Sequence, residues 1–263
     1  MSVHLASVEE GSGPPLAILH GLFGSGRNWA TIAARLATHR RVIRLDLRNH
    51  GGSEWADGMD YEALAADVHA ALAALGIARF ALLGHSMGGK AAMVEALVNP
   101  DAVERLVVVD IAPVAYAPRH LGHVEAMRDV DLATVRRRSD ADRQLAAAIP
   151  DPAERAFLLQ NLVFDTGVAE GRPRWRANLA AIAQAMPALT GFPSFPASAR
   201  YDGPALFVAG GRSDYLRSEH ESEIRRRFPA ARIAHIAEAG HWLHAEQPQQ
   251  FLDLVTRFLA GER

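Results

Sequence analysis

Short apolar runs alternate with longer segments of helical period in the first part of the chain. Apolar side chains recur every three or four residues in segments 29–36 and 64–75, as on one face of an amphipathic helix. Short buried strands that alternate with such helices are typical of a parallel β-sheet. We therefore predict strands at residues 16–19, 42–45, 80–83 and 106–109.

The same rhythm returns near the C-terminus. Two further apolar runs stand at residues 205–209 and 233–236, and each is followed by a segment of helical period, at 218–228 and 248–259. A sheet that is mostly parallel needs helical connections of this kind, which cover both of its faces. The pattern therefore predicts an α/β fold that extends over both ends of the chain.

The middle of the chain breaks this rhythm. From about residue 111 to 201 there is no good strand pattern, and proline and glycine cluster from 187 to 204, where helices should end. A chain of 263 residues suits one α/β domain with a sizeable insertion. We predict a core of residues 1–111 and 202–263, into which residues 112–201 are inserted as a helical cap. Its helical patterns cover residues 124–138, 153–163 and 174–188.

Composition narrows the classes of protein. With 49% hydrophobic residues and a net charge of −2, the chain reads as an ordinary globular protein without the basic excess that nucleic acid requires. The absence of cysteine excludes disulfides and a thiol nucleophile. No apolar run reaches the roughly 18 residues of a membrane span, and residues 1–13 lack a secretory signal pattern. We expect a cytoplasmic protein with a small-molecule substrate.

The strongest chemical signal is the pentapeptide Gly84-His85-Ser86-Met87-Gly88. It follows the predicted strand 80–83 and precedes a helical segment at 90–98. In a nucleophile elbow the serine occupies such a sharp strand-to-helix turn, and the flanking glycines let neighbouring backbone pass closely. The Gly-x-Ser-x-Gly pattern alone is common, but its position between strand and helix makes it specific. We predict that Ser86 is a nucleophile.

A serine hydroxyl needs a neighbouring base, which is usually histidine. In this arrangement the chain order is serine, acid, histidine. Of the 12 histidines, His241 stands near the end of the chain, just after the predicted strand 233–236. His244 is the alternative base. The two histidines lack further ligands at the spacing of a zinc motif, so we expect no metal and no cofactor.

Two carboxylates could orient the imidazole, and both follow predicted strands. Asp110 ends the run 107–109, and Asp214 comes after the strand 205–209. The acid of a catalytic triad stabilises the charged imidazole. Spacing alone favours neither aspartate, and the other one is expected to serve as a turn or capping residue.

Acyl transfer also requires donors for the oxyanion, which backbone amides usually supply. One is expected from Met87, directly after the nucleophile. The second is expected from the turn after the first strong strand, with Leu22 as first choice and Phe23 as the alternative. We predict that His20 holds this turn by packing and hydrogen bonding.

The polar segment 46–53 is expected to be architectural. Gly51 and Gly52 suit a tight turn, and the side chains of Asp46 and Arg48 can bind backbone groups of the loop.

Taken together, these motifs resemble the α/β-hydrolase family, and more narrowly the bacterial YbfF-type esterases with their mitochondrial relatives. The resemblance spans nearly the whole chain, although the cap is matched mainly by Trp175, Arg176 and Asn178. It is carried by the signatures at residues 20–25, 46–51, 84–90, 110–113 and 240–245.

The resemblance implies a cofactor-free hydrolase of short or medium acyl esters or thioesters that works through an acyl-enzyme. It favours Asp110 over Asp214 as the acid beside Ser86 and His241. It also implies that the cap roofs the acyl pocket, with Phe23, Trp175 and Trp242 in the pocket wall and Met87 as a further wall residue.

Two other functions remain open. The same scaffold and triad can hydrolyse carbon–carbon bonds, because one fold serves many reactions. A ligand-binding or signalling protein could also retain the fold and turn over negligibly. Covalent labelling of Ser86 with burst release of product would separate an enzyme from such a binding protein.

Overall fold

A computed structural model describes residues 2–118, 120–164 and 172–262. These residues form a central sheet of seven strands in the order β1-β3-β2-β4-β5-β8-β9. All neighbouring pairs are parallel except β1 and β3. The strands are β1 (Ser7–Glu10), β2 (Pro15–Leu19), β3 (Arg41–Leu45), β4 (Phe80–His85), β5 (Val103–Val109), β8 (Ala205–Gly210) and β9 (Ala231–Ile236).

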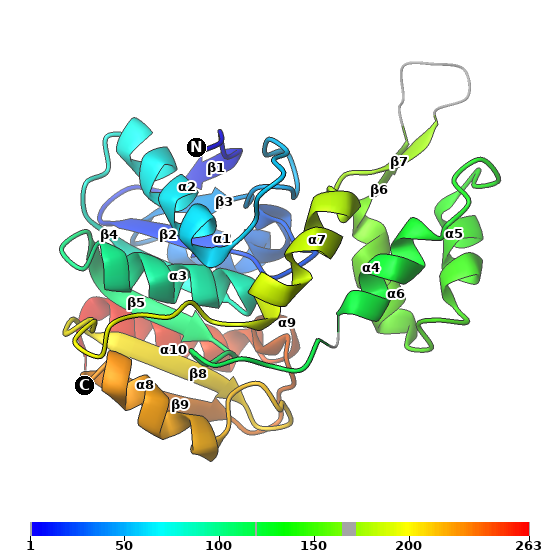
Figure 1. Cartoon of the computed structure of the whole chain (residues 1–263). Coiled ribbons are helices and arrows are strands. Elements are labelled where there is room, and N and C mark those ends of the chain that lie inside the picture. The colour runs from blue at the N-terminus through cyan, green and yellow to red at the C-terminus, as the bar shows by residue number, and fades with distance from the viewer. Residues whose placement is uncertain (1, 119, 165–171, 263) are drawn as a thin grey trace.

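Both faces of the sheet are covered by helices, which explains why the central strands read as continuous apolar runs. In β2, Leu16 and Ile18 pack on one face, while Ala17 and Leu19 pack on the other. The first face is covered by α1 (Ala30–Leu36) and α10 (Pro248–Ala260), and the second by α2 (Tyr61–Ala74), α3 (Met87–Val98) and α8 (Glu221–Arg227). The predicted α/β fold, with a mostly parallel sheet and helices on both faces, is confirmed (Figure 1).

The edge strand β1 was not predicted. It pairs antiparallel with β3 and is largely exposed, so its sequence lacks an apolar run. Ion pairs between neighbouring side chains accompany this pairing, with Glu9 bound to Arg41 and Glu10 bound to Arg44. An edge strand held in this way carries little hydrophobic signal.

The chain between β5 and β8 extends beyond one end of the sheet, at the right of Figure 1. The prediction that it contains no strand is wrong, because β6 (Leu162–Phe164) and β7 (Pro173–Trp175) form an antiparallel pair. Arg119 and residues 165–171 of the predicted cap lie outside the described residues. The helices of this segment are α4 (Leu121–Arg128), α5 (Arg138–Leu145), α6 (Pro152–Leu158) and α7 (Leu179–Thr190).

Helix ends in this segment differ from the sequence pattern for local reasons. The predicted helix 174–188 begins only after Asn178, whose side chain caps α7 by accepting a hydrogen bond from the Ala181 amide at 3.2 Å. The predicted helix 153–163 ends at Leu158 and continues as a short 3₁₀ turn, η2 (Leu159–Asn161). Shorter elements elsewhere are η1 (Gly26–Trp29), η3 (Ser218–His220) and α9 (Leu243–Glu246). Across the described ranges, no helix is both long and apolar enough to cross a membrane.

Candidate active site

Ser86 lies at the sharp turn between β4 and α3. Its backbone has φ 53° and ψ −117°, which is a strained conformation for a residue with a side chain. The turn requires the flanking glycines. A Cβ on Gly84 would lie 2.1 Å from the carbonyl oxygen of Gly88, and a Cβ on Gly88 would lie 2.5 Å from that of His20. The local backbone therefore has the form of a nucleophile elbow.

His241 and Asp110 are in direct contact. The Nδ1 atom of His241 lies 2.7 Å from the Oδ2 atom of Asp110, which follows β5 and is fully buried. The amide of Gly210 donates to Oδ1 at 3.0 Å, and the Ser213 hydroxyl also donates to Oδ2. With an ionised carboxylate on Nδ1, a neutral imidazole carries its proton there and keeps the lone pair on Nε2.

Asp214 lies elsewhere. Its side chain is 61% exposed and pairs with Arg217 at 3.1 Å. It lines a separate depression that contains neither Ser86 nor His241. Of the two carboxylates considered from the sequence, the structure thus brings Asp110, and not Asp214, to the imidazole.

Aromatic rings surround His241. The ring of Tyr215 stacks on it with centroids 4.2 Å apart, and His85 donates from Nε2 to the His241 carbonyl oxygen at 2.9 Å. Burial, followed by repulsion from His241, holds the pKa of His85 well below its ordinary value. His244, the alternative base, is buried and stacks on Trp29 at 4.0 Å, and burial lowers its pKa to about 3.

The turn after β2 lies beside the nucleophile. A Cβ on Gly21 would come within 3.3 Å of the Cβ of Ser86. Within the described residues, the amides of Leu22 and Met87 have no hydrogen-bond partner. The prediction of Phe23 as the alternative donor needs correction, because its amide already donates to Nε2 of His50 at 3.1 Å and is therefore occupied.

A cavity of about 260 Å³ opens above these groups. Ser86 and His241 lie in its wall, together with Phe23 and Trp242, for which the family resemblance implies a place in the acyl pocket. The expectation for Trp175 needs correction, because this residue is buried in β7 and is absent from the cavity wall. Met87 is also absent from it. The apolar part of the wall consists of Leu22, Phe23, Trp29, Phe157, Leu158 and Trp242.

The cavity wall also contains a row of polar side chains (Tyr215, His120, His123 and Glu154) that the sequence did not indicate. The Tyr215 hydroxyl lies 2.9 Å from Nε2 of His120, and the Nδ1 atoms of His120 and His123 are 3.3 Å apart. His123 in turn lies 3.4 Å from a carboxylate oxygen of Glu154. These residues come from the β8–α8 loop, α4 and α6, so no short motif contains them. Residues 2–118, 120–164 and 172–262 contain no group of three or more histidine and acidic side chains that could hold a metal ion.

Comparison with known proteins identifies the family. The family model described as the alpha/beta hydrolase fold matches residues 14–248, so the chain belongs to this family. It is similar to an sn-1-specific diacylglycerol lipase from Mus musculus, at 45% identity over 94% of this chain and 81% of the relative. It is also similar to the esterase YbfF from Escherichia coli, at 37% identity over 93% of this chain and 92% of the relative.

A solved structure supports the same assignment. A marine microorganism esterase superposes with a TM-score of 0.93 at 36% identity, covering 98% of this chain and all of the other. The predicted family, the resemblance to YbfF-type esterases and the assignment as an ester-bond hydrolase are confirmed by these matches.

Proposed function

We propose that the protein is a serine carboxylic-ester hydrolase in which Ser86, His241 and Asp110 form a catalytic triad. The observation that carries this proposal is the 2.7 Å contact between His241 and the buried Asp110, in a cavity whose wall also contains Ser86 at a strained elbow. A carboxylate in this position holds the imidazole in the tautomer that can accept a proton at Nε2.

The reaction follows from these groups. Nε2 of His241 takes the Ser86 proton while the serine oxygen attacks the substrate carbonyl, and the backbone amides of Leu22 and Met87 bind the resulting oxyanion. His241 then gives the proton to the departing alcohol, which leaves an acyl group on Ser86. Water, deprotonated by His241, attacks this ester, and the acid departs as Ser86 regains its proton.

The cavity indicates the class of substrate. Its volume of about 260 Å³ and its apolar wall suit a short or medium acyl chain, carried by an alcohol or a thiol. The relatives are named an esterase and a diacylglycerol lipase, and both names describe hydrolysis of carboxylic esters. Residues of α4 and α6 line the same cavity as Ser86, so we also propose that residues 112–201 act as a helical cap on a core of residues 1–111 and 202–263.

Covalent labelling tests the proposal. A fluorophosphonate probe should modify Ser86, as located by peptide mapping, and p-nitrophenyl esters of graded chain length should be hydrolysed. Ser86→Ala should abolish labelling and lower turnover by several orders of magnitude, on the scale of roughly 10⁶ seen when a triad nucleophile is removed. Folded protein that shows neither labelling nor turnover would instead indicate a ligand-binding protein.

A further inference from the structure

Two histidines join the turn after β2 (residues 20–25) to the polar segment 46–53, and each binds a backbone amide of the other segment. His20, at the start of the turn after β2, accepts a hydrogen bond at Nε2 from the amide of Leu47 at 2.9 Å. His50, in the loop after β3, accepts at Nε2 from the amide of Phe23 at 3.1 Å. Each loop therefore supplies an imidazole to a backbone amide of the other, and the two rings lie 5.2 Å apart.

The tautomers of this histidine pair (His20 and His50) follow from its partners. Because each Nε2 atom accepts, each proton must reside on Nδ1. His20 donates it to the Gly21 carbonyl at 2.8 Å, and His50 donates it to the Arg48 carbonyl at 3.0 Å. Both rings are buried, and burial lowers the pKa of His20 and brings that of His50 to about 3. The pair is therefore neutral at physiological pH, as acceptance at Nε2 requires.

The contact with His50 occupies the amide of Phe23, so this amide is not available to bind an oxyanion. Phe23 adopts a left-handed conformation with φ 61°, its amide points to His50, and its carbonyl accepts from Nδ2 of Asn161 at 2.8 Å. Both polar groups of the Phe23 backbone are thus held away from the nucleophile. The preceding residue, Leu22, has an amide without a partner in the described part of the chain, and it follows Gly21, which lies against Ser86.

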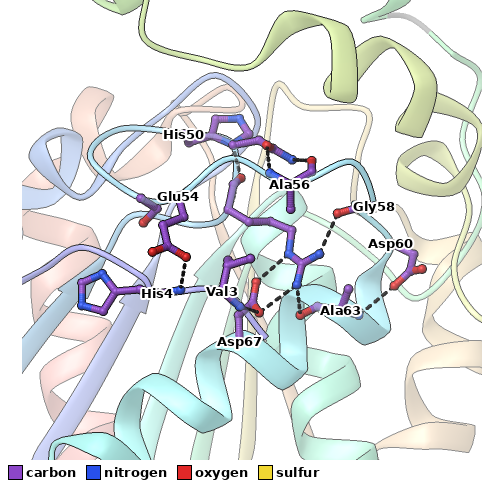
Figure 2. A network of polar contacts seen from close by, with 12 residues as sticks. Val3, His4, His50, Glu54, Ala56, Gly58, Asp60, Ala63 and Asp67 are labelled. Carbon is purple, nitrogen blue, oxygen red and sulfur yellow. Dashed lines mark hydrogen bonds and ion pairs between the residues drawn. The ribbon is translucent and has the colours of Figure 1, made fainter. Parts of the chain in front are cut away.

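The loop that carries His50 is itself held by several polar contacts. Figure 2 shows His50 at one end of a polar network that reaches Asp67 at the other. The Arg48 guanidinium pairs with the fully buried Asp67 at 2.6 and 2.8 Å and donates to the Gly58 carbonyl at 2.6 Å. The side chain of Asn49 exchanges hydrogen bonds with the backbone of Ala56 at 2.9 and 3.0 Å. These contacts are expected to hold the imidazole of His50 in its position beside the amide of Phe23.

We propose that His50 is a positioning residue for the oxyanion hole. It is absent from the cavity wall, so its effect on the reaction passes through the Phe23 amide to the neighbouring amide of Leu22. The inference rests on the proposed serine mechanism and gives a mechanistic role to a segment that the sequence marked only as architecture. A displacement of about 1 Å in a catalytic group can lower a rate about a hundredfold, so this contact is expected to matter for turnover.

Two amide variants test the role of the Nε2 acceptor. In His50→Gln the side-chain oxygen can reach the former Nε2 position and accept from Phe23. In His50→Asn the side chain is one methylene shorter and can replace only the contact at Nδ1. We expect His50→Asn to lower kcat by about 10- to 100-fold with little change in KM, as for a weakened oxyanion donor. His50→Gln should recover most of this loss.

A trifluoromethyl ketone inhibitor gives a second readout, because its adduct with serine carries an oxyanion. Its affinity should fall with kcat in His50→Asn and recover in His50→Gln. Tyr201→Phe serves as the stability control, because it removes a buried 2.9 Å hydrogen bond to the Val103 carbonyl far from the turn. This variant should lower Tm and leave both kcat and inhibitor affinity unchanged.

The outcomes separate the inference from the proposed function. If the wild type is active and the folded His50→Asn variant keeps the same kcat and inhibitor affinity, the role of His50 is overturned, while the proposed serine mechanism stands. Equal losses in the asparagine and glutamine variants would also overturn it, since the position of the acceptor would then be irrelevant. A folded wild type that neither hydrolyses esters nor binds the ketone would overturn the serine mechanism itself.

Discussion

At the scale of single residues, burial distinguishes the two carboxylates that the sequence left open. Asp110 is fully enclosed and accepts hydrogen bonds from Gly210, Ser213 and His241. Asp214 is exposed and pairs with Arg217 at the surface, where such pairs contribute little. Only the first can orient an imidazole.

We therefore expect Asp110→Asn to lower kcat far more than Asp214→Asn. An amide at position 110 presents a donor to Nδ1 and favours the wrong tautomer of His241, and this effect costs about 10⁴-fold in kcat in a related triad. Asp214→Asn should leave kcat unchanged. Steady-state hydrolysis of a p-nitrophenyl ester by both variants, with Tm as the folding check, measures the ranking, and the reverse order would assign the acid to Asp214.

At the scale of elements, one buried amine joins α3 to the end of α7. Lys90, the only lysine in the chain, lies on α3 and donates from Nζ to the carbonyls of Thr190 and Gly191. The rings of Tyr61 and Tyr116 lie 5.5 and 4.7 Å from Nζ. Burial lowers the pKa of Lys90 to about 7 and raises the pKa of both tyrosines, which stay neutral around it.

This shift predicts a pH dependence of stability. Between pH 7 and the ordinary lysine pKa of 10.5, the unfolded chain holds a proton on Lys90 that the folded protein has released. The free energy of unfolding should therefore rise with pH in this window, relative to Lys90→Met, which lacks the titrating group. Urea denaturation of both proteins at pH 7 and pH 9.5 measures the difference.

The single lysine also permits a direct check. Protein labelled with ¹⁵N-lysine has only one Nζ resonance, and its titration gives the pKa of Lys90. A midpoint near 10.5, or a difference in the free energy of unfolding between the two proteins that does not rise with pH, would show that the folded protein does not depress this pKa.

The elbow predicts a second effect at this scale. In Gly84→Ala the new Cβ would lie 2.1 Å from the Gly88 carbonyl oxygen, and backbone there cannot move without displacing Ser86. We expect strong destabilisation and loss of fluorophosphonate labelling. Gly122→Ala is the matched control, since nothing lies within 4 Å of its Cβ and it stands in α4. It should stabilise the protein by about 0.5–1 kcal/mol. Equal Tm values for the two variants would contradict this account of the turn.

The sequence predicted those elements whose burial is visible as a local run or period of apolar residues. The central strands β2, β4 and β8 are buried along nearly their whole length because both faces are covered, whereas β1 is exposed and β6 and β7 have only three residues each. Likewise, Ser86 and His241 stand in short motifs. The polar row of Tyr215, His120, His123 and Glu154 depends on contacts between distant elements, and so does the burial of Trp175. Neither the polar row nor the burial of Trp175 produces a periodic pattern in the sequence.

At the scale of the whole molecule, the predicted cap shares an apolar cluster with the sheet. Val124 of α4 and Ile182 of α7 belong to the same buried cluster as Leu82 of β4 and Leu106 of β5. A polar contact reinforces this packing, because the amide of Asn178 donates to the Asn49 carbonyl at 2.9 Å. The apolar core of the inserted segment is therefore continuous with that of the sheet.

We predict that cap and core unfold together. Chains longer than about 150 residues often unfold in steps, so a single unfolding transition for both parts would be informative in a chain of 263 residues. Two variants that each keep one tryptophan, either Trp29 beside the sheet or Trp175 in β7, can follow the two parts by fluorescence in urea, while far-UV circular dichroism follows all helices. The three midpoints should agree, because loss of the shared cluster exposes both parts at once.

A transition of Trp175 at clearly lower urea, with the surroundings of Trp29 still native, would instead make residues 112–201 an independently unfolding unit. The cavity beside Ser86 would then lose the wall that α4 and α6 supply before the sheet itself unfolds.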